Sequence, residues 1–354
     1  MTMASIAPEH PAVSQRRSTT RGLRTIGVVC TAIVATAWAT AVWLPLGVSM
    51  LAVFLFAAPH NWMECRYFLQ RMPGRWGPLR LYYWSGLGGA FLLAAASLLL
   101  PSTARAWALE FEAWMTLLAV WNSALVAWVV WLAYLRRREK LQRAATRQPA
   151  VEHNLWPLLF AGGWVLIAVA WLAPVGWSLA LVYLHPLIAL WFLDRELLRR
   201  RVAWHGVYRA ALGVLPFCLA GLWWMLWSKP DLPGDDLVSL QITRHAGRGV
   251  VPGVSTHLLV ATHVFLEMLH YAVWLLAIPS IGMLGKPWQL DKMPMARKSA
   301  IWKWGVATVL LVGGVAVIGF WGGFAANYPA TRDIYFAVAI LHVLTEAPFL
   351  IRLL

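Results

Sequence analysis

The stretch HLLVATHVFLEMLHYAVWLLAIPS, residues 257–280, is an apolar run interrupted by three histidines and one glutamate. About 20 consecutive apolar residues are enough for an α-helix to cross the hydrocarbon core of a bilayer, so this run predicts a transmembrane helix. Ionisable side chains are costly in that environment and usually face the interior of a helical bundle. The segment therefore predicts a membrane fold and also marks where its chemistry lies.

The composition of the whole chain agrees with this segment. Of the 354 residues, 60% are hydrophobic and only 13% are charged, whereas a soluble domain carries about a quarter charged residues. Ten apolar runs read as spans: 26–44, 47–64, 80–100, 109–134, 155–171, 175–193, 209–227, 257–280, 302–322 and 334–350. The sequence thus predicts an all-α, polytopic transmembrane helical bundle of about ten spans.

The net charge of +15 follows the predicted topology. If the N-terminus is cytoplasmic, 25 of the 30 Lys and Arg residues lie on that side, in segments 16–24, 66–80, 136–147, 195–209 and 286–303 and at Arg352. Such an excess is the positive-inside signature of membrane proteins. It predicts a multi-pass protein of the cell inner membrane with both termini cytoplasmic. The basic residues are therefore expected to lie against membrane lipids at the cytoplasmic surface, and no nucleic-acid partner is expected.

The sequence predicts one domain. Residues 1–24 are polar and basic, and we expect a disordered cytoplasmic tail there, followed by a single transmembrane domain over 25–354. The longest predicted outer segment, 228–256, is rich in Pro, Gly and Asp and is expected to be a loop. The three cysteines form no CxxC motif, so neither a disulfide framework nor a thiolate metal site is expected.

Histidines and carboxylates recur at helical spacing inside the predicted spans. Five of the ten histidines fall there: His60, His185, His263, His270 and His342. The pattern H-x-x-x-E occurs as His60/Glu64, His263/Glu267 and His342/Glu346. Residues i and i+4 share one helical face, so each pair points an imidazole and a carboxylate the same way. Glu267 and His270 add an E-x-x-H pair, a spacing that supplies metal ligands in four-helix di-iron proteins.

Depth along the spans places four of these histidines in one layer. At about 1.5 Å per residue, they lie about 12–20 Å from the outer ends of four different spans. We therefore predict a metal site whose ligands are His60, His185, His270 and His342. His263 and Glu64 are further candidate ligands, and Glu267 and Glu346 are candidate catalytic carboxylates. His263, Glu64 and Glu346 are also candidates for orienting the ligands or for moving protons. We expect His205 and His245 to lie outside the site.

The ligand types narrow the choice of metal. Neutral imidazole and carboxylate without thiolate suit iron, manganese or zinc. We expect non-haem iron. Zinc, and a haem held by two histidines from facing helices, stay open as alternatives.

The segment AAPHNWME, around His60 and Glu64, resembles the P-H-x-x-x-D histidine segment of the bacterial β-carotene central-cleavage dioxygenases, the bacteriorhodopsin-related-protein-like family. Members of that family are bundles of apolar helices whose membrane histidines bind iron and which cleave a carotenoid to retinal. The resemblance implies that His60 is an iron ligand and that Glu64 stands where the family has Asp. It covers this one motif; the segments THVFLEMLHYAVW and LHVLTEAPFLIR do not match the family's other motifs, and this chain is longer.

These expectations combine into a membrane-embedded oxygenase that uses iron and dioxygen on an apolar, lipid-soluble substrate such as a carotenoid or an isoprenoid. Two other classes use the same groups: a transporter or proton relay, and a haem-binding electron carrier linked to quinone. A sharp Soret band favours haem, bound iron without that band favours non-haem chemistry, and absence of metal favours the relay. The sequence has no visible internal repeat of the kind common in transporters.

Overall fold

The computed structural model describes residues 11–144, 156–283 and 285–353. The described residues are almost entirely helical and contain no strand. The long helices are α1 (Pro11–Trp43), α4 (Arg80–Ala106), α5 (Phe111–Ala144), α7 (Pro174–Arg200), α8 (Val202–Leu226), α12 (Ala300–Ala326) and α13 (Tyr328–Leu353). The remaining α-helices are α2 (Pro45–Ala52), α3 (Ala58–Arg71), α6 (Trp156–Leu172), α9 (Leu237–His245), α10 (Thr256–Ala272) and α11 (Ile278–Ile281). This confirms the predicted all-α helical bundle.

Two of the spans contain a π-helical turn. Residues Val53–Ala57 (η1) join α2 to α3, and Val273–Ala277 (η3) join α10 to α11, so that Pro45–Arg71 and Thr256–Ile281 are each one continuous apolar helix. Short 3₁₀ turns, η2 (Gly77–Leu79) and η4 (Leu290–Lys292), lie in the loops.

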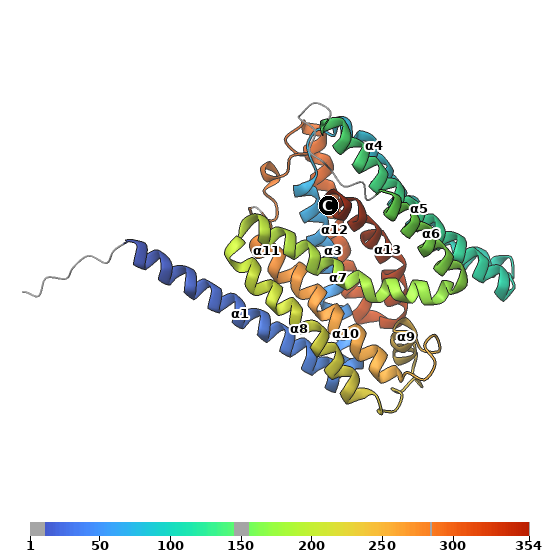
Figure 1. The fold of residues 1–354 in the computed structure, drawn as a ribbon. Helices are drawn as coiled ribbons and strands as arrows, with labels where there is room; N and C mark the ends of the chain where they lie inside the picture. Colours follow the sequence, from blue (N-terminus) through green and yellow to red (C-terminus); the bar gives the residue numbers. More distant parts are fainter. Residues whose placement is uncertain (1–10, 145–155, 284, 354) are drawn as a thin grey trace, which may run out of the picture.

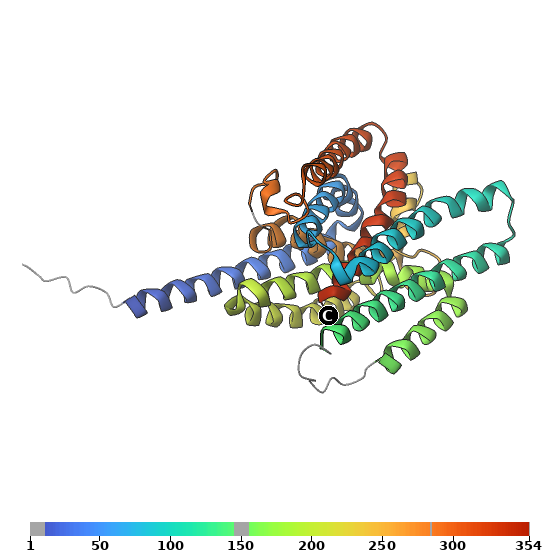
Figure 2. The same ribbon diagram turned by 90° about the horizontal axis from the view of Figure 1, so that it is seen from above.

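Nine helices in the described residues are long and apolar enough to cross a membrane. They correspond to nine of the ten predicted spans. The tenth, α6, has only 17 residues, or about 25 Å of helix, against a hydrocarbon core of about 30 Å. Most of its residues are exposed, and it runs beside α5 at one edge of the molecule (Figure 2). The chain is therefore a multi-pass membrane protein by the length and composition of its helices.

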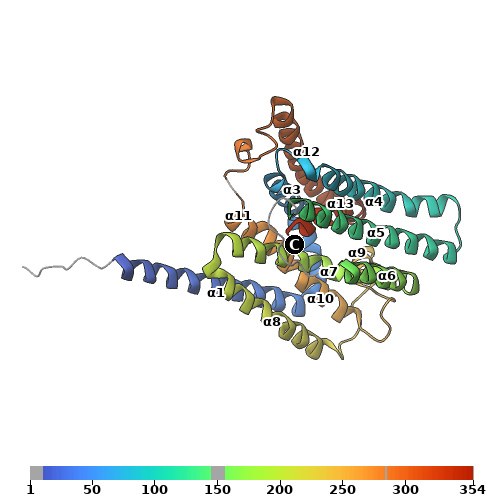
Figure 3. The same ribbon diagram turned by 45° about the horizontal axis from the view of Figure 1, so that its top comes forward.

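The helix α10 forms the centre of the bundle (Figure 1). Of its 17 residues, 14 are buried, whereas only three of the 27 residues of α12 are. The helices α1, α7 and α8 pack against α10, and α13 packs against α3, α4, α7 and α12. Figure 3 shows α4, α5 and α6 together at one edge and α1 with α8 at the opposite edge. Polar residues of α10 are thus held in the protein interior, as the bilayer requires.

The structure describes helices in two segments that the sequence predicts as a tail and a loop. The helix α1 begins at Pro11, so residues 11–24 of the predicted tail belong to a helix that continues into the first span. Residues 1–10 lie outside the described part of the chain. The outer segment 228–256 is not only a loop, since it contains α9. Asp236 caps that helix by accepting a hydrogen bond from the backbone N–H of Ser239, at 2.9 Å.

The same outer segment fixes the start of α10. The carboxylate of Asp231 accepts hydrogen bonds from the backbone N–H of Thr256 at 2.6 Å and from its hydroxyl at 3.0 Å. These bonds lower the pKa of Asp231. Ser255 caps the helix by accepting from the N–H of Leu258. The N-terminal groups of the central helix are thereby satisfied at the membrane surface.

Candidate metal centre

Three histidines from three helices meet inside the bundle. His60 on α3, His270 on α10 and His342 on α13 each offer a ring nitrogen, and these atoms all lie within 4.8 Å of one another. Within the described part of the chain, this is the one set of three or more potential ligands that lie so close. The Nε2 atoms of His60 and His342 are 3.4 Å apart. Two nitrogens bound to one ion at about 2.1 Å in tetrahedral geometry are roughly 3.4 Å apart, so the spacing fits a shared metal.

The π-helical turn before α3 sets the orientation of His60. The Nδ1–H of His60 donates to the backbone carbonyl of Phe56 at 3.1 Å, and the Tyr335 hydroxyl donates to the carbonyl of Ala57 at 3.1 Å. A π-helical turn shifts the regular hydrogen-bond ladder and frees carbonyls for such side-chain donors. With the proton on Nδ1, the lone pair on Nε2 of His60 is left for a metal.

His270 lies just before the second π-helical turn, and neither of its ring nitrogens forms a well-aligned hydrogen bond with the protein. Its side chain is 2% exposed. A buried polar atom without a partner is rare and calls for an explanation. The donor set of neutral imidazoles fits an ion of iron, manganese or zinc at this point. The orphaned ring of His270 is what such an ion would explain.

His185 lies beside the three histidines, on α7. Its ring centroid is 4.7 Å from that of His270 and 5.2 Å from that of His342. The Nδ1 atom is 3.1 Å from Oε2 of Glu346. The structure therefore brings all four predicted histidine ligands together, with His185 at the side of the cluster next to a carboxylate.

Two glutamates lie one helical turn beyond the histidines, toward the inner end of the spans. Glu64 follows His60 on α3, and Glu346 follows His342 on α13. They are 1% and 0% exposed, and their four carboxylate oxygens form no well-aligned hydrogen bond. In the span of α10, the residue four positions after His270 is the fully buried Trp274 of η3. The H-x-x-x-E pairs thus separate into an imidazole layer and a carboxylate layer.

A third set of polar groups lies on the outer side of the cluster. The hydroxyl of Tyr271 donates to Oε1 of Glu267 at 2.7 Å, and the Tyr271 ring is 4.8 Å from that of His60. His263 lies one turn further out, with Nδ1 at 3.7 Å from Oε2 of Glu267. Its ring contacts His245 at 5.0 Å between centroids. His263 is therefore not among the three converging histidines, and it forms the next step of a polar column.

Sequence reasoning missed two members of this column. His245 falls in the segment predicted as an outer loop, yet it ends α9, and its ring lies 4.4 Å from that of Phe336 between centroids. Burial and the neighbouring His263 and Arg332 charges lower the pKa of His245. Tyr271 also had a signal, because it stands four residues after Glu267 and next to His270. His205, by contrast, lies away from the site as predicted and forms a 2.8 Å contact with Asp194.

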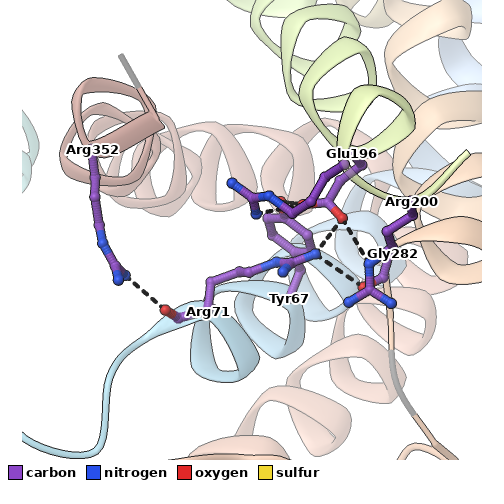
Figure 4. A network of polar contacts seen from close by, with 7 residues as sticks. Tyr67, Arg71, Glu196, Arg200, Gly282 and Arg352 are labelled. Carbon is purple, nitrogen blue, oxygen red and sulfur yellow. Dashed lines mark hydrogen bonds and ion pairs between the residues drawn. The ribbon is translucent and has the colours of Figure 1, made fainter. Parts of the chain in front are cut away.

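An ionic network closes the inner end of the bundle (Figure 4). The buried Glu196 accepts from the Tyr67 hydroxyl at 2.8 Å and from the guanidinium of Arg71. It also lies 3.2 Å from Nε of Arg200. Arg352 of α13 donates to the backbone carbonyl of Arg71 at 2.8 Å. The network joins α3, α7 and α13, three of the four helices that carry the histidines.

Comparison of the chain with protein-family models, with curated protein sequences and with solved structures gives no match. The function is therefore inferred from the residues of the site.

Proposed function

We propose that this chain is a membrane-embedded non-haem metal oxygenase of the cell inner membrane that acts on an apolar, lipid-soluble substrate such as a carotenoid or an isoprenoid. The observation that carries the proposal is the convergence of His60, His270 and His342, with the ring nitrogens of His270 lacking a well-aligned hydrogen bond. Iron is our first choice, because imidazole and carboxylate donors without thiolate suit it. Bound there, iron would supply redox chemistry and open coordination positions for dioxygen.

The geometry argues for an ion rather than a haem between these rings. The two axial nitrogens of a haem lie on opposite sides of the iron and are roughly 4 Å apart, with the macrocycle between them. The Nε2 atoms of His60 and His342 are 3.4 Å apart. The ring of His270 lies 5.0 Å from His60. This crowding of imidazoles fills the space that a flat macrocycle needs.

The chain's own residues have roles around such an ion. Phe56 holds His60 in one tautomer through its backbone carbonyl. The carboxylate of Glu267, which accepts from Tyr271, can take up or release a proton beside the histidines. A floor of aromatic rings excludes water from the inner side, where Tyr67 packs on Trp274 at 5.5 Å between centroids.

An apolar cavity beside the helix of His270 supports the choice of substrate class. A cavity of about 240 Å³ lies between α1, α7, α8 and the α10–α11 span. Its walls are almost wholly apolar and include Ile33, Leu190, Leu212, Leu269 and Val273. Leu269 and Val273 flank His270 along the chain, so the cavity lies on the neighbouring face of the same helix. A hydrocarbon ligand suits this environment, whereas a charged one does not.

A proton relay is the second candidate. It is favoured by the column of His245, His263, Glu267 and Tyr271, which continues from the outer side to His60. Chains of ionisable groups across a membrane bundle mark proton paths in pumps and transporters.

Elemental analysis and the visible spectrum of the detergent-purified protein separate these candidates. We expect stoichiometric iron without a Soret band. A protein that stays metal-free after reconstitution with iron, manganese and zinc would overturn the oxygenase and support the relay. A sharp Soret band would instead indicate haem.

Substitutions then test the ligands. We expect His60→Ala, His185→Ala, His270→Ala and His342→Ala each to weaken metal binding at least about tenfold, since even the loss of a residue that orients a ligand costs that much. His205→Ala is the matched control, because that imidazole contacts Asp194 elsewhere in the bundle. Full occupancy in three of the four variants would contradict a shared site.

A further inference from the structure

A site with one metal ion, held by His60, His270 and His342, leaves two buried carboxylates unexplained. Glu64 and Glu346 are almost completely inaccessible, and their oxygens form no well-aligned hydrogen bond. In the described part of the chain, neither pairs with an Arg or Lys. They stand on α3 and α13, two helices that pack against each other. A buried carboxylate without a cationic partner is costly, and here Glu346 has only the imidazole of His185 beside it, at 3.1 Å.

Helical spacing places these carboxylates in one layer next to the histidines. Glu64 and Glu346 stand at i+4 from His60 and His342, whose Nε2 atoms are 3.4 Å apart. One turn of helix separates the layers by about 5.4 Å. His185 lies at the boundary, with its ring against His270 and His342. Its Nδ1 is directed toward the carboxylate layer.

The spacing of His185 and Glu346 matches the spacing of two side chains that bind the same metal ion. Their Nδ1 and Oε2 atoms are 3.1 Å apart, yet both atoms lack a hydrogen-bond partner with acceptable angles. Two ligand atoms about 2.1 Å from one ion, and about 95° apart at that ion, are roughly 3.1 Å from each other. The distance therefore fits coordination of one ion by both residues, as well as a direct imidazole–carboxylate contact.

We propose that Glu64, Glu346 and His185 hold a second divalent cation, next to the ion at His60, His270 and His342, so that the centre is dinuclear. This inference rests on the proposed metal site. Two carboxylates and one divalent cation sum to zero charge, which removes the cost of burying the glutamates. Their oxygen donors favour iron or manganese at this position. The donors are spread more widely than the three histidines, and we expect the Glu64 side chain to rotate onto the ion.

The test uses Mn²⁺ as the probe on the full-length protein in detergent. After loading and removal of free metal, manganese per chain is counted by mass spectrometry, and the electron paramagnetic resonance spectrum reports whether two ions are coupled. We expect about two ions per chain with a coupled signal in the unaltered protein. The variant E64Q/E346Q, which keeps the side-chain volumes, is expected to bind about one ion with the signal of isolated Mn²⁺.

Each other result has a distinct meaning. No bound manganese in the unaltered protein would remove the proposed metal site altogether. One ion in both the unaltered protein and E64Q/E346Q would overturn the second position and leave the histidine site intact. Two ions in both would show that the second ion lies elsewhere. The exposed pair Glu110 and Glu112 provides the control E110Q/E112Q, expected to keep two ions, and size-exclusion chromatography reports the folding of every variant.

Discussion

The carboxylate of Glu196 connects the inner ends of α3 and α7 through hydrogen bonds and ion pairs. It is fully buried, and its partners come from α3 and from α7 itself. A buried carboxylate is tolerated only when its oxygens are paired and hydrogen-bonded. Here Tyr67 and Arg71 provide the partners from α3. The small residue Gly282 allows the close approach, since a Cβ at this position would lie 3.3 Å from the Glu196 carboxylate.

We expect Glu196→Ala to destabilise the protein by about 3 kcal/mol, because it leaves the buried Tyr67 hydroxyl without its acceptor and removes the charge that Arg71 and Arg200 share. Thermal unfolding of the detergent-purified protein, followed by size-exclusion chromatography, measures the loss. The control is Arg199→Ala, whose side chain is 46% exposed and 3.4 Å from Glu196. This exposed pair should contribute less than about 1 kcal/mol. Equal stability of Glu196→Ala and the unaltered protein would contradict the role of the network.

At the scale of a helix, periodicity predicted the faces of the histidines but not all of their neighbours. His263 and His270 share a face of α10, yet seven residues separate them by about 10 Å along the axis, so only one can join a given layer. The i+4 rule correctly predicted that Glu64 and Glu346 accompany His60 and His342. It could not predict the π-helical turns. The carbonyls freed in η1 accept hydrogen bonds from the ring of His60 and from Tyr335 of α13. Tyr335 lies far along the sequence, so local spacing gives no sign of this partner.

The π-helical turn η1 gives a prediction at this scale. Deleting Leu55, whose side chain is 42% exposed, should restore a regular α-helix and rotate His60 by about 100° relative to α2. It should also return the carbonyl of Phe56, which fixes the His60 tautomer, to the regular helical hydrogen-bond ladder. We expect metal affinity to fall about 10- to 100-fold, as when a residue that orients a ligand is lost. Metal titration measures the effect.

The matched control for this deletion is Leu55→Ala, which keeps the helical register and should bind metal like the unaltered protein. If the deletion and the substitution bind metal equally well, the π-helical turn has no part in placing His60.

At the scale of the whole molecule, the predicted spans agree with the apolar helices of the bundle, and the orientation stays a prediction from the distribution of charge. Basic residues predicted the orientation, and the apolar runs predicted the spans, because both follow directly from the bilayer as solvent. The packing order of the helices could not be predicted in the same way. All spans are apolar, so hydropathy does not distinguish the buried α10 from the lipid-facing α12. The ionisable residues of α10 were the signal that marked it as central.

The short helix α6 decides the topology of the second half of the chain. If α6 crosses the membrane, the segments that follow α4 and α8 lie on the same side; if it does not, they lie on opposite sides. The figures show α6 alongside α5 and within the same layer of helices. We therefore expect α6 to cross, with the bilayer thinned locally around its 17 residues.

Single-cysteine labelling tests this arrangement. In a background lacking Cys30, Cys65 and Cys218, the exposed positions Ser102 and Asp235 are changed one at a time to cysteine. A membrane-impermeant maleimide should label both Ser102→Cys and Asp235→Cys in intact cells. It should label Lys286→Cys, in a basic inner loop, only after permeabilisation. Labelling of Ser102→Cys without Asp235→Cys would mean that α6 stays on one side, and that the N-terminus and the C-terminus face opposite compartments. Such a result would also reverse the charge argument, since the basic segment 286–303 would then face outward against the positive-inside rule.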